Sequence, residues 1–259
     1  MIKSLNRANI ERRDFCLLTG GSVASLMLSS ACRRVTSTSA IGDGRLSART
    51  SNNVKTTVSG KIALNTAGDR DAILQVPAKA SNSAVPLLVF LHGAGQSAAE
   101  MLEYMGSVPE EAGVAVLAAN SIDYTWDAIT DTFGPDVQSL NRLLEEVFKK
   151  VSVDPSKLAL GGFSDGATYG LSLGLINGDL FTRIVAFSPG FVLEGVASGK
   201  PELFISHGTH DHILPIDSCS RRIVASLKSR GYNVTLREFD GDHEVPDVVA
   251  REALSWLAR

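Results

Sequence analysis

The sequence has few cysteines, no large excess of charge and, after its first 32 residues, no long apolar run. Three cysteines in 259 residues are too few for a disulfide scaffold. A formal net charge of −3 gives no basic surface of the kind that binds nucleic acid. No later segment reaches the length of about 20 apolar residues that a membrane-spanning helix needs. The apolar fraction of 44% supplies enough material for one sizeable core.

The first 32 residues have the character of an export signal. Arg12 and Arg13 are followed by Phe15 and an apolar run over residues 16–28, which resembles the twin-arginine motif. The run is about 13 residues long, which is too short to span a bilayer. We therefore expect export by a bacterial twin-arginine-type route, to the periplasm or beyond. The alternative is a buried or frayed N-terminal helix.

Residues 28–32, Leu-Ser-Ser-Ala-Cys, resemble a lipoprotein cleavage box. The departure is Ser29, where such boxes usually carry an aliphatic residue, so the sequence leaves lipidation of Cys32 open. A lipid there would be the expected means of membrane attachment. Residues 33–53 are rich in small and polar residues without periodicity and are predicted to be a flexible tether. Residues 54–259 are predicted to form the folded domain.

This domain alternates between short apolar runs and amphipathic patterns. The expected strands are residues 54–65, 71–76, 85–92, 113–119, 158–161, 183–187, 203–206 and 234–238, and the expected helices are 97–105, 136–151, 166–176, 217–230 and 246–257. The alternation predicts an α/β protein with a mostly parallel, doubly wound sheet flanked by helices. The first two strands are expected to pair antiparallel. Right-handed crossovers bring the loops after the parallel strands to one edge.

Ser164 lies at the centre of Gly-Phe-Ser-Asp-Gly over residues 162–166, where an apolar run meets a helical pattern. A Gly-x-Ser-x-Gly at a strand-to-helix turn is typical of a nucleophile elbow, because small residues let strand and helix pass closely. A serine hydroxyl also needs a histidine base and a carboxylate that orients it. Asp211 and His243 follow later strands in the required order. These three residues are therefore candidates for nucleophilic catalysis.

With these residues the chain resembles the α/β-hydrolase superfamily. The matching stretches are Leu-His-Gly-Ala-Gly at 91–95, Gly-Gly-Phe-Ser-Asp-Gly at 161–166, His-Gly with Asp and Pro over 207–215, and Asp-His-Glu at 242–244. The nearest branch resembles the phospholipase/carboxylesterase group, which includes acyl-protein thioesterases. Secreted polyhydroxybutyrate-depolymerase-like and feruloyl-esterase-like enzymes are also similar. The resemblance covers roughly residues 84–258.

The resemblance implies an α/β-hydrolase fold with Ser164 as nucleophile, Asp211 as acid and His243 as base. The backbone amides of Ala94 and Asp165 would form the oxyanion hole. Asp165 stands where the thioesterase branch often has Gln, which weakens any transfer of thioesterase specificity. Only about 15 residues separate the strands ending at 187 and starting at 203, so no large lid domain is expected.

Trp126, Asp127 and Phe133 follow the strand 113–119, on the same predicted edge, and are candidates for a substrate pocket. Local packing is the alternative for these three. His207, His210 and His212 surround Asp211 and invite a metal interpretation, but Thr209 stands where a metallo-β-lactamase-like motif has its second histidine. We therefore expect no metal.

Two further histidine assignments remain. His92 is expected to hold the loop that carries Ala94. Asp240 and Asp242 flank His243 and are alternatives to Asp211 as its orienting acid, although neighbours in sequence usually point elsewhere.

These observations predict an exported serine hydrolase that cleaves carboxylic esters through an acyl-enzyme. The expected substrate is a small-molecule or lipid-like ester, and no cofactor is required. A polyester depolymerase, a feruloyl esterase or a serine peptidase on the same fold is the alternative. A non-catalytic envelope lipoprotein, using the fold for binding, is a different class, against which the complete set of three residues argues.

Overall fold

The computed structural model describes residues 42–51, 53–65 and 71–259. The predicted export signal, the Cys32 lipidation site and the first part of the predicted tether lie outside these residues. In the described part of the chain, no helix combines the length and the apolar character needed to cross a membrane.

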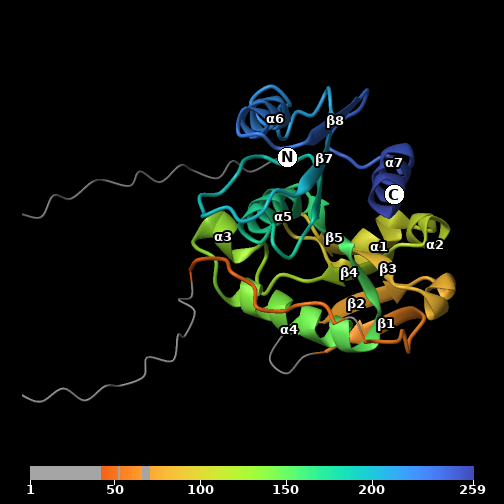
Figure 1. Cartoon of the computed structure of the whole chain (residues 1–259). Helices are drawn as coiled ribbons and strands as arrows, with labels where there is room; N and C mark the ends of the chain where they lie inside the picture. Colours follow the sequence, from red (N-terminus) through yellow and green to blue (C-terminus); the bar gives the residue numbers. More distant parts are fainter. Residues whose placement is uncertain (1–41, 52, 66–70) are drawn as a thin grey trace, which may run out of the picture. The chain divides into compact units, whose positions relative to one another are not determined.

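An eight-stranded sheet forms the centre of the described structure (Figure 1). Its strands are β1 (Gly60–Leu64), β2 (Ala72–Val76), β3 (Val85–Leu91), β4 (Ala115–Ala119), β5 (Val153–Phe163), β6 (Arg183–Phe187), β7 (Glu202–Gly208) and β8 (Val234–Phe239). The spatial order is β1-β2-β4-β3-β5-β6-β7-β8. β2 runs antiparallel to β1 and β4, and the other neighbours are parallel. The predicted mostly parallel sheet with an antiparallel start is confirmed.

Helices cover both faces of this sheet (Figure 1). One face packs against α4 (Pro135–Lys150), α5 (Asp165–Ile176) and α6 (Ser220–Ser229), and the other against α1 (Ala98–Met105), α2 (Val108–Ala112) and α7 (Asp247–Ala258). The side chains of β3 alternate between the two cores: Leu87 and Val89 join the first, and Leu88 joins the second. A strand buried on both sides reads as a continuous apolar run, which is why the sequence reveals it.

Short elements depart from the sequence prediction. The helices α2 and α3 (Asp127–Thr130) and the 3₁₀ turn η1 (Ala78–Asn82) were not expected, because each is too short to show a periodic pattern. β1 begins at residue 60 instead of 54, and β5 begins at 153 instead of 158. The early part of β5 contains Pro155 and pairs with β3 across a register shift, so only its later half reads as a strand. Between β6 and β7 the described chain contains no helix, in agreement with the predicted lack of a large lid.

The predicted flexible tether is wrong for residues 43–50, which pack against the domain. Leu46 and Ala48 are buried, with exposed fractions of 3% each. The side-chain oxygen of Asn177 accepts a hydrogen bond from the Leu46 amide at 2.9 Å, and that of Asn141 accepts from the Ala48 amide at 2.9 Å. Two helices therefore hold this extended segment through side-chain to backbone hydrogen bonds.

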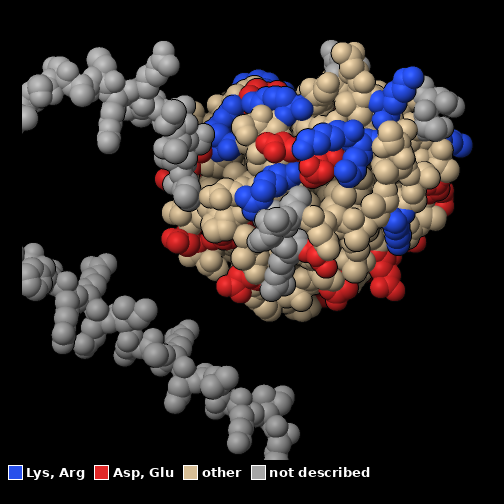
Figure 2. All heavy atoms as spheres, turned by 90° about the horizontal axis from the view of Figure 1, so that it is seen from below, with Lys and Arg blue, Asp and Glu red and all other residues tan. Residues whose placement is uncertain are grey.

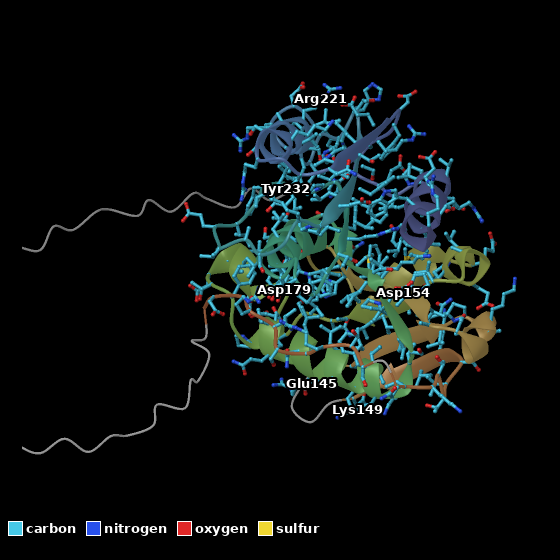
Figure 3. All side chains as sticks on the ribbon, viewed as in Figure 1. Glu145, Lys149, Asp154, Asp179, Arg221 and Tyr232 are labelled. Atoms are coloured by element: carbon cyan, nitrogen blue, oxygen red, sulfur yellow. The ribbon has the colours of Figure 1, made fainter. Side chains whose placement is uncertain are left out.

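Ion pairs add to this attachment. Arg45 and Arg49 both contact Asp179, labelled in Figure 3, with N–O distances of 2.9 Å. Within α4, and apart from this segment, Lys149 and Lys150 pair with Glu146. Figure 2 shows Lys and Arg side chains beside Asp and Glu on the face seen from below. Such partly exposed pairs contribute about 1 kcal/mol or less each, so the buried apolar side chains of the segment matter more.

Candidate functional site

Ser164 lies at the sharp turn between β5 and α5, with φ 55°. Positive φ is rare for a residue with a side chain and costs on the order of 1–3 kcal/mol. The backbones around this turn approach one another closely. A Cβ atom at Gly166 would lie 2.2 Å from the Leu91 carbonyl oxygen, and one at Gly162 would lie 2.5 Å from the same atom. The glycines of the motif thus permit α5 to begin directly against the end of β3.

A chain of hydrogen bonds joins the three predicted side chains. The Ser164 hydroxyl lies 2.9 Å from Nε2 of His243, in position to donate to it. Nδ1 of His243 lies 2.7 Å from Oδ2 of Asp211 and donates to that carboxylate. Ser164 follows β5, Asp211 follows β7 and His243 follows β8, so three strand ends at one edge of the sheet bring them together. The geometry suits proton transfer from the hydroxyl to the imidazole.

The Asp211 carboxylate is fully buried but has several donors. The amides of Ile213 and Leu214 donate to Oδ1 at 3.0 and 2.7 Å. Oδ2 faces His243 and also lies 3.1 Å from Nε2 of His207. These donors replace the water that a buried charge would otherwise lose.

His207 is itself buried and hydrogen-bonded at both ring nitrogens. Burial lowers the pKa of His207, because the imidazolium loses its hydration, so the ring is neutral at neutral pH. Nε2 donates to the Leu214 carbonyl at 2.7 Å, and Nδ1 then accepts from the Ser220 hydroxyl at 2.7 Å. The single N–H of this ring therefore points at the loop that carries Asp211.

The other candidates near His243 lie elsewhere. Asp242 accepts from the His243 backbone amide and pairs with His212, and Asp240 pairs with His210. Neither carboxylate contacts the His243 ring through a hydrogen bond, so Asp211 is its partner in the structure. Among the described residues, no cluster of metal-ligating side chains is present.

The loop of residues 92–96, which follows β3 and is called the β3 loop here, lies against Ser164. A Cβ atom at Gly93 would lie 3.3 Å from the Cβ of Ser164. Hydrogen bonds hold the loop: Gly95 donates to the Tyr124 carbonyl, and the Gln96 side chain accepts from the Gly93 amide. The amides of Ala94 and Asp165 donate no hydrogen bond within the described chain. Both amides are therefore free to bind an oxygen atom from outside the protein.

His92 links this loop to the chain after β4. Its Nε2 accepts from the Ser121 amide at 3.0 Å, so Nδ1 carries the hydrogen and donates to the Gly93 carbonyl at 2.8 Å. The indole Nε1 of Trp126 donates to the His92 carbonyl at 2.9 Å. His92 thus lies where a residue holding the β3 loop is expected.

The structure does not place Trp126 and Phe133 on a pocket wall. Both are buried, with exposed fractions of 0% and 5%, and Tyr169 packs between them. Their position after a strand suggested the functional edge, but their rings turn inward to the core of α4 and α5. Asp127 lines a separate surface hollow, and its carboxylate accepts hydrogen bonds from nearby backbone amides. Local packing, the alternative to a pocket, therefore accounts for Trp126 and Phe133.

The chain after β4, residues 120–134, is called the β4 loop here and closes around two carboxylates, that of Asp127, which is half-buried, and that of Asp136, which is buried. Asp127 accepts from the amides of Gly134 and Asp136 and from the Tyr169 hydroxyl. Asp136 accepts from the amides of Ile122 and Asp127. Sequence reasoning missed this pairing, because two aspartates at this spacing are common in loops of any fold and do not by themselves indicate burial.

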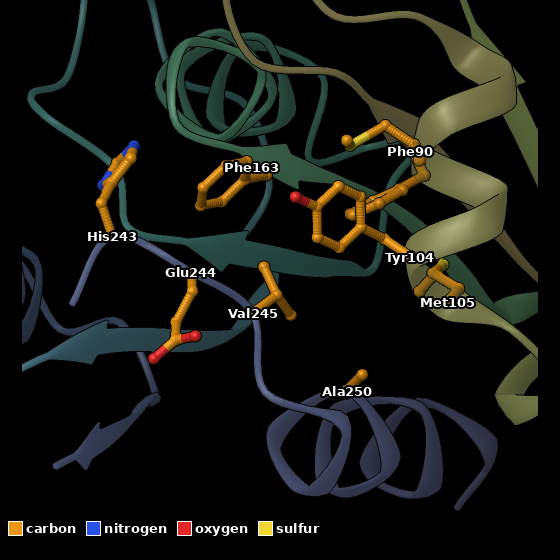
Figure 4. A pocket seen from close by; sticks show the side chains of 9 residues that line it. Phe90, Tyr104, Met105, Phe163, His243, Glu244, Val245 and Ala250 are labelled. Atoms are coloured by element: carbon orange, nitrogen blue, oxygen red, sulfur yellow. The ribbon is translucent and has the colours of Figure 1, made fainter. Parts of the chain in front are cut away.

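A mostly apolar cavity lies beside the side chain of His243 (Figure 4). Its walls come from Phe163, from α1 and from the segment that leads from His243 into α7. The Phe163 ring packs on the His243 ring with a centroid distance of 4.8 Å. Sequence reasoning missed this cavity too. The apolar periodicity of α1 predicts a helix with a buried face, but it does not predict which strand end that face approaches.

Asp136→Asn tests the electrostatics of the β4 loop. Burial raises the pKa of Asp136 from 3.8 to about 6. The folded state therefore binds a proton that the unfolded chain releases, so the contribution of Asp136 to stability is largest below pH about 4 and falls as pH rises to about 6. Over about two pH units this amounts to about 3 kcal/mol. Asn cannot ionise, so we expect the variant to lose that decline, measured as the free energy of unfolding in urea from pH 4 to 7.

The exposed Asp131→Asn is the matched control and should keep the wild-type slope. Asp136→Asn also alters the hydrogen bonds from the amides of Ile122 and Asp127, so the comparison uses the slope of stability with pH and not its absolute value. Parallel curves for wild type and Asp136→Asn would contradict an elevated pKa.

Solved structures share this fold. FphF, a fluorophosphonate-binding serine hydrolase of Staphylococcus aureus, superposes with a TM-score of 0.62 at 14% identity, covering 77% of this chain and 97% of that one. A ferulic acid esterase of Anaeromyces mucronatus, in complex with ferulic acid, gives 0.58 at 19% identity over 80% and 92% of the two chains. At such identities these likenesses show the fold alone.

Comparison of sequences adds to this likeness in fold. The chain is 27% identical over 146 residues to NocK of Nocardia uniformis subsp. tsuyamanensis, a protein named as an esterase. The match covers 52% of this chain and 42% of NocK, so the chain spans less than half of that relative's length. Residues 121–258, slightly more than half of the chain, match the phospholipase/carboxylesterase family. This match includes the hydrogen-bonded Ser164, Asp211 and His243 but not the β3 loop. With its mostly parallel sheet and this match, the chain belongs to the phospholipase/carboxylesterase family of α/β-hydrolases.

Proposed function

We propose that the protein is a serine hydrolase of carboxylic esters in which Ser164 is the nucleophile. The observation that carries the proposal is the unbroken series of hydrogen bonds from Ser164 through His243 to Asp211, with distances of 2.9 and 2.7 Å. A serine hydroxyl becomes a competent nucleophile when a neighbouring imidazole takes its proton. Membership of an esterase family supports ester hydrolysis as the reaction.

The proposed reaction has two halves. The Ser164 oxygen forms a bond to the ester carbonyl carbon while His243 takes its proton, and the carbonyl oxygen becomes an anion. The free amides of Ala94 and Asp165 bind that anion. The bond to the alcohol oxygen then breaks, and His243 gives its proton to the departing alcohol. Water, deprotonated by His243, attacks the acyl-enzyme and releases the acid and free Ser164.

The substrate proposed is a small neutral ester or a lipid-like one. The Anaeromyces relative in fold is named for ferulic acid, and NocK is named as an esterase. The short connection between β6 and β7 favours an open site without a helical lid. Polyester depolymerase and serine peptidase remain the alternatives on the same residues. A panel of acyl esters, lysophospholipids, polyhydroxybutyrate and aminoacyl substrates separates them.

Ser164→Ala is the direct test. We expect loss of ester hydrolysis by at least about 10⁴-fold, because removal of a serine nucleophile disables the whole reaction. Labelling by a fluorophosphonate probe should also disappear, while the circular dichroism spectrum and thermal midpoint stay close to wild type. Ser255→Ala, an exposed serine on α7, is the control and should label fully. Retained turnover in the Ser164 variant would refute the assignment.

His207 is proposed as a positioning residue for Asp211. His207→Phe removes the single N–H of this ring, on Nε2, which donates to the Leu214 carbonyl and lies 3.1 Å from Oδ2 of Asp211. Hydrogen bonds to charged groups contribute about 1.5–3 kcal/mol, so we expect kcat to fall about 10–100-fold with little change in KM. Asp211 then carries less compensated charge and stabilises the protonated His243, so the acidic limb of the pH–rate profile moves to higher pH.

His207→Gln, which keeps an N–H donor, should recover part of the lost rate. A merely structural role for His207 would lower thermal stability without moving the pH profile, and that result would contradict the proposal.

Export is proposed for the first 32 residues, on the strength of the paired Arg12 and Arg13 and the apolar run behind them. Mass spectrometry of the protein from a bacterial host is expected to find processing near residue 32, with or without a diacylglyceryl group on Cys32. Replacement of both arginines by lysine should leave the precursor in the cytoplasm. An uncleaved N-terminus on protein with wild-type arginines would contradict export.

A further inference from the structure

We infer that the apolar cavity beside His243 binds the alcohol part of the ester and selects short apolar alcohol groups. The inference rests on the proposed function and adds to it the class of leaving group.

The walls of this cavity are mostly apolar. Met101, Tyr104 and Met105 reach it from α1, and Val245 and Ala250 from the start of α7. In Figure 4 the Tyr104 ring extends from α1 toward Phe163. Glu244 also lines the cavity, but a Cβ atom at Gly241 would lie 2.7 Å from its Oε1, so its charge is directed toward that loop. The space therefore suits an uncharged hydrocarbon group.

The position of the cavity assigns it to the alcohol and not to the acid. His243 must give its proton to the departing alcohol oxygen, so that oxygen lies within hydrogen-bond reach of Nε2 when its bond breaks. The group attached to it then extends along the His243 side of Ser164, and the His243 ring is part of the cavity wall. The proposed oxyanion donors, Ala94 and Asp165, are not part of this wall, and Ser164 itself is represented only by its neighbour Phe163 and its partner His243.

The size of the cavity limits the alcohol. Its free space is about 30 Å³, and one water-sized group needs roughly 10–15 Å³ on this scale. Two or three carbon atoms therefore fill it. A longer chain has to displace Tyr104, whose side chain is exposed, or the two flexible methionines. Each methylene that fits is worth about a fourfold gain in binding, and each one beyond the filled cavity gains less.

The experiment uses two ester series with the full-length enzyme. Acetate esters of ethanol, propanol, butanol and hexanol vary the alcohol alone, and methyl esters of the acids with two to eight carbons vary the acyl group alone. For the wild type we expect kcat/KM to rise about fourfold from ethyl to propyl acetate and to gain nothing further at hexyl acetate. Tyr104→Ala should raise the hexyl-to-ethyl ratio about tenfold and leave the order of the methyl esters as it is.

Two matched variants serve as controls. Tyr104→Phe keeps the ring and should keep the wild-type ratio. Val248→Ala removes an exposed apolar side chain of α7 that is not part of the cavity, and it too should keep that ratio. Because Tyr104 is exposed, its truncation leaves the core intact.

The partitioning of the acyl-enzyme between water and an added alcohol tests the alcohol site separately from the acyl site. With one acetyl donor, added propanol or hexanol competes with water for the acyl group and forms the new ester, the reverse of alcohol release. Tyr104→Ala should raise the hexanol-to-propanol product ratio about tenfold.

The outcomes separate the two proposals. A Tyr104→Ala effect on the acyl series instead of the alcohol series would overturn the inference, and so would no effect on either. Both of those results leave Ser164 labelled and active, so the proposed function survives them. If no ester is cleaved and the fluorophosphonate probe does not label Ser164, the proposed function itself has failed.

Discussion

The close approach of β3, β5 and the first turn of α5 is the constraint on which the site depends. At Gly162 and Gly166 only a hydrogen atom fits between the backbones. α5 can therefore begin against the end of β3, and Ser164 is held in a strained turn next to the β3 loop. The strain persists because residues 166–176 of α5 are all buried between sheet and neighbouring elements. A side chain at either glycine would push α5 and Ser164 away from the end of β3.

The second requirement is a fixed carboxylate at the far end of the hydrogen-bonded chain. Asp211 is buried, and a buried charge is tolerated when its lone pairs are satisfied. Its donors come from its own loop, from His243 and from the His207 ring, which Ser220 orients in turn. Because burial keeps His207 neutral, it supplies an N–H without a competing positive charge. The imidazole of His243 is then the group in this set placed to gain and lose a proton.

Sequence reasoning predicted most of the sheet, because strands buried on both faces leave continuous apolar runs such as 85–91 and 115–119. It also identified three side chains that the structure brings together, since each follows a strand and parallel strand ends share an edge. It did not predict the attachment of residues 43–50. That attachment comes from Asn141 and Asn177, over 90 residues away, and leaves no periodic pattern. Nor did it predict which aromatic side chains of the β4 loop turn inward. A position after a strand predicts the edge at which a residue lies, but not the direction in which its side chain points.

The two sides of Ser164 differ in how firmly they are built. On one side, the Thr125 hydroxyl donates to the Asp165 carboxylate at 2.7 Å, and the β3 loop is held by His92 and Trp126. Groups held by hydrogen bonds of fixed geometry suit the binding of an oxyanion, where a small displacement is costly. On the other side, the cavity wall includes Met101 and Met105, whose unbranched side chains adapt to irregular spaces, and the exposed Tyr104. Under the proposed function, the rigid side would hold the oxyanion, whereas the adaptable side would accommodate the alcohol group of the ester.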